Sequence, residues 1–120
     1  MDATDRILGL ASRLGQAIGE SDRCKALRAA EAKLKESKAS QDALRAMNEL
    51  VRKVRDLEAR QQPVEVEDKR ALRERQEQVR ADVVLQELAK AEADMVELMS
   101  NVNRAIEEGM AGKADKAENG

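Results

Sequence analysis

Very few side chains of this sequence could carry out chemistry, and their spacing does not assemble a reactive site. Cys24 is the only cysteine, and the chain has no histidine to activate its thiol or complete a zinc site. The acidic pairs Glu107–Glu108 and Glu65 with Glu67 could approach a metal, but consecutive helical residues diverge and no further carboxylate cluster accompanies them. The sequence therefore predicts no catalytic residue, no cofactor-binding residue and no metal ligand, and hence no enzyme.

Cys24 lies on the apolar stripe of a helical pattern, together with Leu27, Ala30 and Leu34. On such a stripe a small apolar thiol is usually packing material. A catalytic thiol is the alternative, and it predicts that Cys24→Ala abolishes any turnover found. The chain contains no GxxxxGK[ST] phosphate loop, no CxxC pair and no GxSxG elbow, so nucleotide, iron–sulfur and hydrolase chemistry have no motif support.

The composition predicts a thin hydrophobic core. Leu, Ile and Val together number 24 of 120 residues, and aromatic residues are absent. Without aromatic side chains the chain lacks the platforms on which single-stranded nucleic acids stack their bases. No segment is apolar and long enough for a membrane span, and one cysteine cannot form an internal disulfide, so we expect a cytoplasmic protein.

The periodicity of apolar residues predicts an all-α protein, an antiparallel helical bundle of about five helices with coiled-coil-like packing. Two long helices are expected at about 41–62 and 83–110, and shorter helices at 22–36 and 68–80. A first helix carries Ile7, Leu14 and Ile18 on one face. We expect one helical domain at residues 1–110, followed by a disordered tail at 111–120.

The helix boundaries follow from residues that cap or break helices. Gly19 is expected to end the first helix in a left-handed conformation, with Ser21 or Asp22 capping the second. Ser40 and Asp82 are the expected N-caps of the two long helices. The stretch 64–67 is expected to be a loop.

The two long helices carry apolar residues at alternating steps of three and four, which is the spacing of a coiled-coil seam. One chain of this composition has little bulk with which to cover both seams, so we expect them to form an interface between chains. The predicted interface residues are Met47, Leu50, Val54, Leu57, Leu88, Met95, Leu98 and Val102.

Charge is distributed unevenly, with a net charge of +3 over residues 1–62 and −5 over residues 63–120. The outer side of the 41–62 helix is basic, and this face could contact a partner, RNA phosphates or the acidic half of the chain. A solvated helix surface is the simpler interpretation. The residues of this basic face are Arg45, Arg52, Lys53, Arg55 and Arg60.

A sequence pattern from Leu14 to Gln41 carries a family resemblance. It reads LG.AI.ES...KAL..AE.KL......Q, and its most specific part is the Glu20–Ser21 pair at that spacing. The pattern resembles that of the YlbF/YmcA-like family of small helical bacterial regulators, and the similarity extends over about residues 5–108. The chain departs from the family where Ala81–Asp82 replaces the usual Asn-Pro break.

The resemblance implies a non-enzymatic regulator that forms a homodimer or a hetero-oligomer with related helical proteins. It further implies an RNase or RNA-processing partner, because relatives join a complex that steers RNase Y and influences competence, sporulation and biofilm formation. Some relatives carry cysteines linked to iron–sulfur clusters, but this chain has Cys24 alone. No cofactor and no small-molecule substrate are expected. An RNA-binding helical protein and a generic helical dimerisation scaffold are the alternatives.

Overall fold

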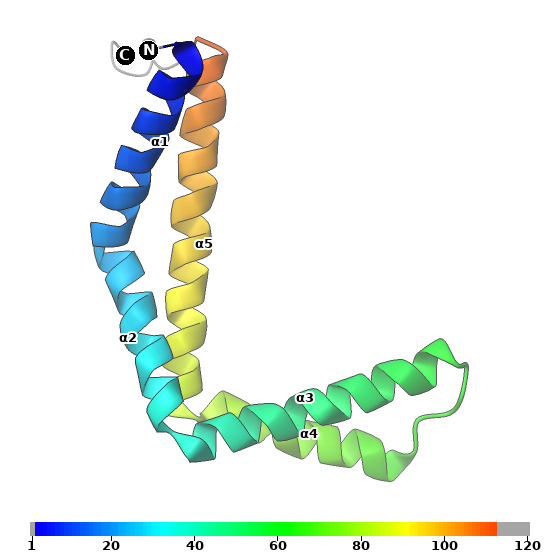
Figure 1. Cartoon of the computed structure of the whole chain (residues 1–120). Helices are drawn as coiled ribbons and strands as arrows, with labels where there is room; N and C mark the ends of the chain where they lie inside the picture. The colour runs from blue at the N-terminus through cyan, green and yellow to red at the C-terminus, as the bar shows by residue number, and fades with distance from the viewer. Residues whose placement is uncertain (1, 113–120) are drawn as a thin grey trace. The chain divides into compact units, whose positions relative to one another are not determined.

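The computed structural model describes residues 2–112, which contain helices, turns and short connections but no strand. The helices are α1 (Ala3–Glu20), α2 (Asp22–Glu36), α3 (Lys38–Ala59), α4 (Val66–Ala81) and α5 (Val83–Met110) (Figure 1). The all-α class and the number of helices are thus as predicted. The expected disordered tail lies outside the described residues from 113 onward.

The junction between α1 and α2 is made by Ser21 rather than by a glycine. The prediction that Gly19 ends the first helix in a left-handed conformation was wrong, because α1 continues through Glu20 and ends at an extended Ser21 (φ −68°, ψ 152°). The Ser21 hydroxyl accepts a hydrogen bond from the Cys24 N–H at 3.2 Å, which caps α2. Of the two capping residues considered for the second helix, Ser21 is therefore the one that acts.

The amino end of α3 differs from the prediction by about one helical turn. Ser37, not Ser40, is the N-cap, because the Ser37 hydroxyl accepts a hydrogen bond from the Ser40 N–H at 3.2 Å. Ser40 then lies inside the first turn of α3, where it is buried. At the other end, α3 stops at Ala59, before the expected Gln62, and Gln61 adopts a positive φ of 59°.

The boundaries of α4 and α5 follow from their first residues. The expected loop at 64–67 was wrong in its second half, because α4 begins at Val66 and places the carboxylates of Glu67 and Asp68 in its first turn. Negative charge is favourable at that end of a helix. The prediction for Asp82 was correct, since its Oδ1 atom accepts a hydrogen bond from the Leu85 N–H at 3.0 Å and caps α5.

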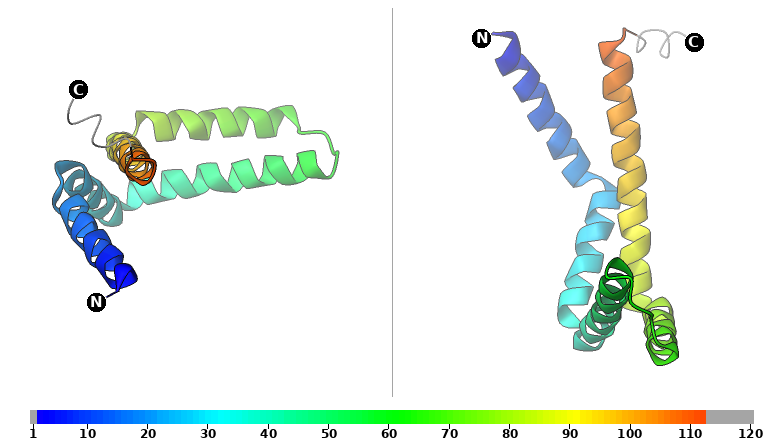
Figure 2. Two further views of the ribbon diagram at one scale, coloured as in Figure 1. Left: turned by 90° about the horizontal axis from the view of Figure 1, so that it is seen from above. Right: turned by 90° about the vertical axis from the view of Figure 1, so that its right-hand side faces the viewer.

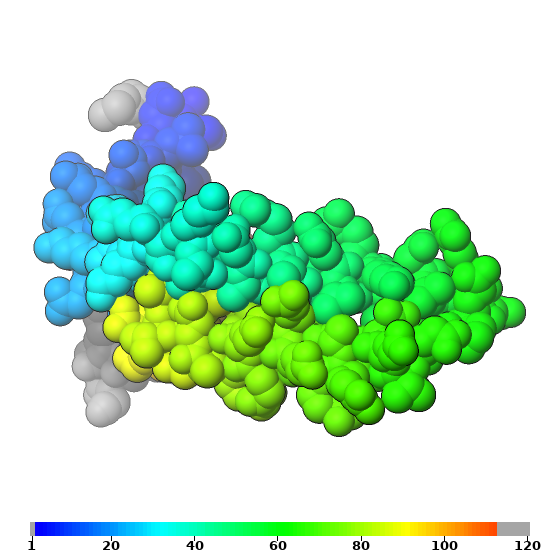
Figure 3. Space-filling model, turned by 90° about the horizontal axis from the view of Figure 1, so that it is seen from below, coloured from blue at the N-terminus to red at the C-terminus, as the bar shows by residue number. Residues whose placement is uncertain are grey.

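The chain divides into two compact units, which are described separately. In the α3–α4 unit (residues 28–89), α3 and α4 pack side by side as an antiparallel pair (Figure 3). In the α1–α5 unit (residues 2–27 and 90–112), α1 and the later part of α5 run antiparallel (Figure 2). A closed antiparallel bundle of all five helices and a single domain spanning residues 1–110 stay predictions.

The core is as thin as the composition indicates. Among the described residues only Ala30, Leu85 and Ala91 are buried apolar side chains, and Ser40 is the one buried polar residue. Helix α1 has no buried residue at all. Most of the apolar stripes are therefore half-buried or exposed in a single copy of the chain.

Candidate interaction surfaces

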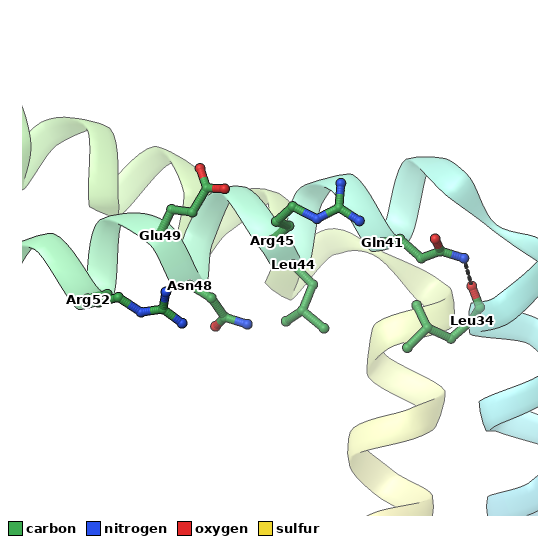
Figure 4. A pocket seen from close by; sticks show the side chains of 7 residues that line it. All are labelled: Leu34, Gln41, Leu44, Arg45, Asn48, Glu49 and Arg52. Carbon is green, nitrogen blue, oxygen red and sulfur yellow. Dashed lines mark hydrogen bonds between the residues drawn. The ribbon is translucent and has the colours of Figure 1, made fainter.

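A shallow groove runs along the outer side of α3 and begins at the end of α2 (Figure 4). It encloses about 400 Å³, and its residues are Leu34, Gln41, Leu44, Arg45, Asn48, Glu49 and Arg52. The α3 members recur at helical steps of three and four, which places them on one face. Leu34 and Leu44 are half-buried, whereas Arg45 and Arg52 are exposed. The groove therefore combines apolar side chains with two cations.

Gln41 fixes one end of this groove. Its side-chain amide donates hydrogen bonds to the backbone oxygens of Leu34 at 2.8 Å and of Lys35 at 3.0 Å. These carbonyl groups lie in the last turn of α2, where that of Leu34 also accepts from the Ser37 N–H at 3.1 Å. Gln41, which closes the family-like sequence pattern, thus holds the α2–α3 corner in place.

The structure divides the predicted basic face into paired and unpaired cations. All five residues are exposed, but Arg45 contacts Asp42 at 3.4 Å, Lys53 contacts Asp68 at 2.9 Å and Arg60 contacts Asp56 at 3.5 Å. Within the described chain, Arg52 and Arg55 have no ion pair. Arg45 and Arg52 come together around the groove, whereas Lys53 turns toward α4.

The predicted interface residues are all half-buried. Those of α3 (Met47, Leu50, Val54 and Leu57) lie on a helix whose extensive packing is with α4, so part of that seam is covered within the chain. Those of α5 begin with Leu88 in the α3–α4 unit and continue with Met95, Leu98 and Val102 in the α1–α5 unit. Their role as an interface between chains stays a prediction.

A partly buried polar junction, which the sequence did not indicate, joins α3 to the start of α5. The Ser40 hydroxyl donates to the Asp82 carboxylate, at 2.8 Å from Oδ2 and 3.0 Å from Oδ1, and accepts from the Ser37 hydroxyl at 2.9 Å. The pKa of Asp82 is lowered, first by the Leu85 N–H and then by Ser40, while partial burial opposes both. Asp82 was found as a cap, but its partner 42 residues away could not be read from local spacing.

Cys24 is half-buried in the first turn of α2. No group of three or more carboxylate, thiol or imidazole side chains in residues 2–112 is placed to hold a metal ion. The Ser40 hydroxyl, which donates to Asp82, belongs to a residue that is 2% exposed, so it is not placed to attack a substrate. Within the same range, no helix is both long and apolar enough to cross a membrane.

An all-helical chain with a thin core and shallow charged grooves is typical of small helical interaction modules. The family model described as "Control of competence regulator ComK, YlbF/YmcA" matches residues 7–111. The chain belongs to this family, which confirms the resemblance carried by the Leu14–Gln41 pattern. The description of the family indicates a regulatory role for its members. Searches among curated proteins and among solved structures found no significant match.

Proposed function

We propose that this protein is a non-enzymatic regulatory adaptor of the cytoplasm that acts by oligomerisation and protein–protein contacts. The observation that carries the proposal is the scarcity of buried apolar side chains, which are limited to Ala30, Leu85 and Ala91 in the described chain. Burial of apolar surface is the main favourable term in folding, and it must exceed the large entropic cost of ordering the chain. A second chain would supply the apolar surface that one copy lacks.

The exposure of large aliphatic side chains supports this proposal. Ile7, Leu8 and Leu10 of α1 are 54–62% exposed, and Val96 and Ile106 of α5 are 70% and 47% exposed. Exposed apolar patches on small proteins mark surfaces that contact a partner.

We propose that the seams of α3 and α5 contribute to this assembly through Met47, Leu50, Val54, Leu57, Leu88, Met95, Leu98 and Val102. All eight side chains keep part of their surface exposed in a single copy, although α4 already packs against α3. The assembly is a homodimer or a hetero-oligomer with related helical proteins.

We further propose that the basic face of α3 contacts the regulated partner, an RNA-processing machinery of the RNase Y type. The partner is the one that the family resemblance implies, and the groove bearing Arg45 and Arg52 supplies cations beside apolar side chains. Direct RNA binding by this face is less favoured, because Arg45, Lys53 and Arg60 are already paired with carboxylates.

Light scattering of the full chain over a dilution series tests the assembly. We expect a mass above that of one chain, and we expect Leu50→Asp to lower this mass or to unfold the protein, because a carboxylate is forced into apolar packing. Asn48→Asp is the control, since it adds the same charge on the exposed side of α3. A wild-type protein that stays single at all concentrations contradicts the proposal, and Leu50→Asp with wild-type mass and melting contradicts the role of the α3 seam.

Quantitative affinity purification from the native cell tests the partner. We expect the RNase machinery to be recovered with the wild type and lost with Arg45→Glu/Arg52→Glu. Lys69→Glu/Arg73→Glu, on the exposed side of α4, is the charge-matched control. Equal recovery with both variants contradicts the assignment to α3, and purified protein that binds RNA with a steep salt dependence favours the RNA alternative.

A further inference from the structure

The apolar stripe of α1 becomes steadily more exposed toward the amino end of the helix. Ile18 is half-buried, but the exposed fraction rises to 38% at Leu14, 54% at Leu10 and 62% at Ile7. These four residues recur along the chain at steps of three, four and four, so they form one continuous face of the helix. Over the first three turns of α1, the described residues cover this face only partly, because its side chains are 38–62% exposed.

The α5 helix shows the same trend in the same unit. Ala91 is buried, Leu98 and Val102 are half-buried, and Ile106 is 47% exposed. The right-hand view of Figure 2 shows α1 and α5 diverging toward their free ends. Within this unit, Arg23 at the start of α2 contacts α5. It donates to the backbone oxygen of Asp94 at 3.2 Å and contacts the Glu97 carboxylate at 3.8 Å. The two apolar faces therefore diverge from the point where Arg23 makes these two polar contacts.

The charges beside these two faces are complementary. Arg6 and Arg13 border the α1 stripe and line a shallow notch of about 320 Å³ together with Asp5, Gly9 and Leu10. Neither arginine makes an ion pair within the described residues. Helix α5 carries six carboxylates and two cations between Val83 and Met110, and the carboxylate of Glu92, which borders the stripe next to Ala91, makes no described ion pair. A second copy therefore brings acidic side chains to a surface that bears two free arginines.

We propose that a second copy of this chain occupies the open face of the α1–α5 unit, with the α1 stripe of one copy packed on the α5 stripe of its partner. This inference rests on the oligomerisation in the proposed function and names the surface that carries it. A two-fold axis makes the arrangement reciprocal, because each copy offers one α1 and one α5 face. The two faces then complete a four-helix arrangement of these elements and cover the side chains that a single copy leaves exposed.

Leu10→Asp compared with Leu8→Asp tests this surface in the full chain. Leu8 is 62% exposed on the same helix, but it lies about a quarter of a turn or more from the stripe, so it controls for the new charge and for helix propensity. We expect Leu10→Asp to weaken self-association at least tenfold in light scattering over a dilution series. Leu8→Asp should keep the wild-type mass, and both variants should keep the wild-type helix content.

Cross-linking provides a second measurement if Leu10→Asp fails to fold. Because Cys24 is the only cysteine, Cys24→Ala gives a background without thiols. We expect a mixture of Leu10→Cys and Val102→Cys chains in this background to form a covalent heterodimer with a flexible bis-maleimide. A mixture of Leu8→Cys and Val102→Cys chains should yield much less of the covalent heterodimer. Absence of the Leu10–Val102 product from an oligomeric protein overturns the proposal.

The outcomes separate this inference from the proposed function. An oligomeric wild type whose mass is unaffected by Leu10→Asp overturns the surface named here and leaves the adaptor proposal standing. A wild type that remains single overturns both. If the protein has the mass of one chain and Leu10→Asp lowers its melting temperature at every concentration, α1 packs on α5 of its own chain. That result also overturns the proposal that a second copy covers this face.

Discussion

The two units of this chain have similar helical stripes but differ in how far one copy holds them together. In the α3–α4 unit, several polar contacts join different elements, among them Ser40 with Asp82, Gln41 with Leu34, Lys53 with Asp68, and Lys33 with Glu87. In the α1–α5 unit, Arg23 alone makes the described polar contacts between helices. Leu85, the only large buried apolar side chain in residues 2–112, also belongs to the α3–α4 unit.

This difference shows how a helical chain without aromatic residues can fix part of its structure. A hydrogen bond to a carboxylate is directional and specifies which helices meet, whereas half-buried aliphatic side chains specify this only weakly. We therefore expect substitutions in the α3–α4 unit to change stability directly, and substitutions on α1 to act through association with another chain.

The largest effect is expected at Leu85, which is 6% exposed. Leu85→Ala should lower the free energy of unfolding by about 2–5 kcal/mol, because it removes buried methyl groups and leaves a cavity. Urea unfolding followed by far-ultraviolet circular dichroism at one protein concentration measures this change. Leu8→Ala on the exposed side of α1 is the matched control and should change stability by less than about 0.5 kcal/mol. If both variants lost the same free energy of unfolding, the two units would not differ in how far their own side chains stabilise them.

A smaller effect is expected at Ser40, which is 2% exposed. Ser40→Ala should lower the free energy of unfolding by about 1 kcal/mol, since it deletes the hydroxyl that binds Asp82. Ser12→Ala, at an exposed position of α1, is the control for replacing serine by alanine within a helix. If both variants are equally stable, the Ser40–Asp82 contact does not hold the α3–α4 unit together.

The contribution of Asp82 should depend on pH. Its folded-state pKa is lowered below 3.8, so the ionised form is favoured by folding. The contribution of the ionised Asp82 to stability is fully present above pH 3.8, and it is lost as the pH falls through the folded-state pKa. The difference in melting temperature between the wild type and Asp82→Asn should therefore narrow in acid. Glu49→Gln, at an exposed carboxylate, controls for loss of one charge, and a pH-independent difference for Asp82 would refute the prediction.

The smallest effect is expected for the ion pair between Lys53 and Asp68, in which the lysine side chain is 56% exposed. Lys53→Met should lower the free energy of unfolding by a few tenths of a kcal/mol, up to about 1, because exposed ion pairs are weakened by solvent and salt. Arg55→Met is the control, since Arg55 has no described ion pair. Thermal unfolding at low and high salt should show a loss for Lys53→Met that shrinks as salt is added.

The sequence predicted those features that depend on neighbouring residues. Asp82 was identified as the cap of α5, and the bounds of that helix were correct, because a capping side chain and an apolar period act within a few residues. Gly19 was misassigned because an extended serine can end a helix without a left-handed residue. Ser40 was misassigned because Ser37 is an equally good cap one turn earlier.

The features that the sequence did not predict depend on distant residues. The contact of Ser40 with Asp82 and that of Lys53 with Asp68 require knowing which helices meet, and no local spacing contains this information. The basic face illustrates the same limit, since its five cations were placed correctly on one helix but three of them are paired with carboxylates. Charge counted along a sequence therefore overestimates the charge that a surface offers to a partner.

Three of the four connections between helices consist of one residue each, at Ser21, Ser37 and Asp82. Adding or deleting one residue at such a joint would rotate the following helix by about 100° and turn its apolar stripe toward water. The six-residue connection from Arg60 to Glu65 has no such constraint, and five of its residues are exposed. Length variation among relatives, and any inserted tag or fluorescent reporter, should therefore be tolerated at residues 60–65 and rejected at the three joints.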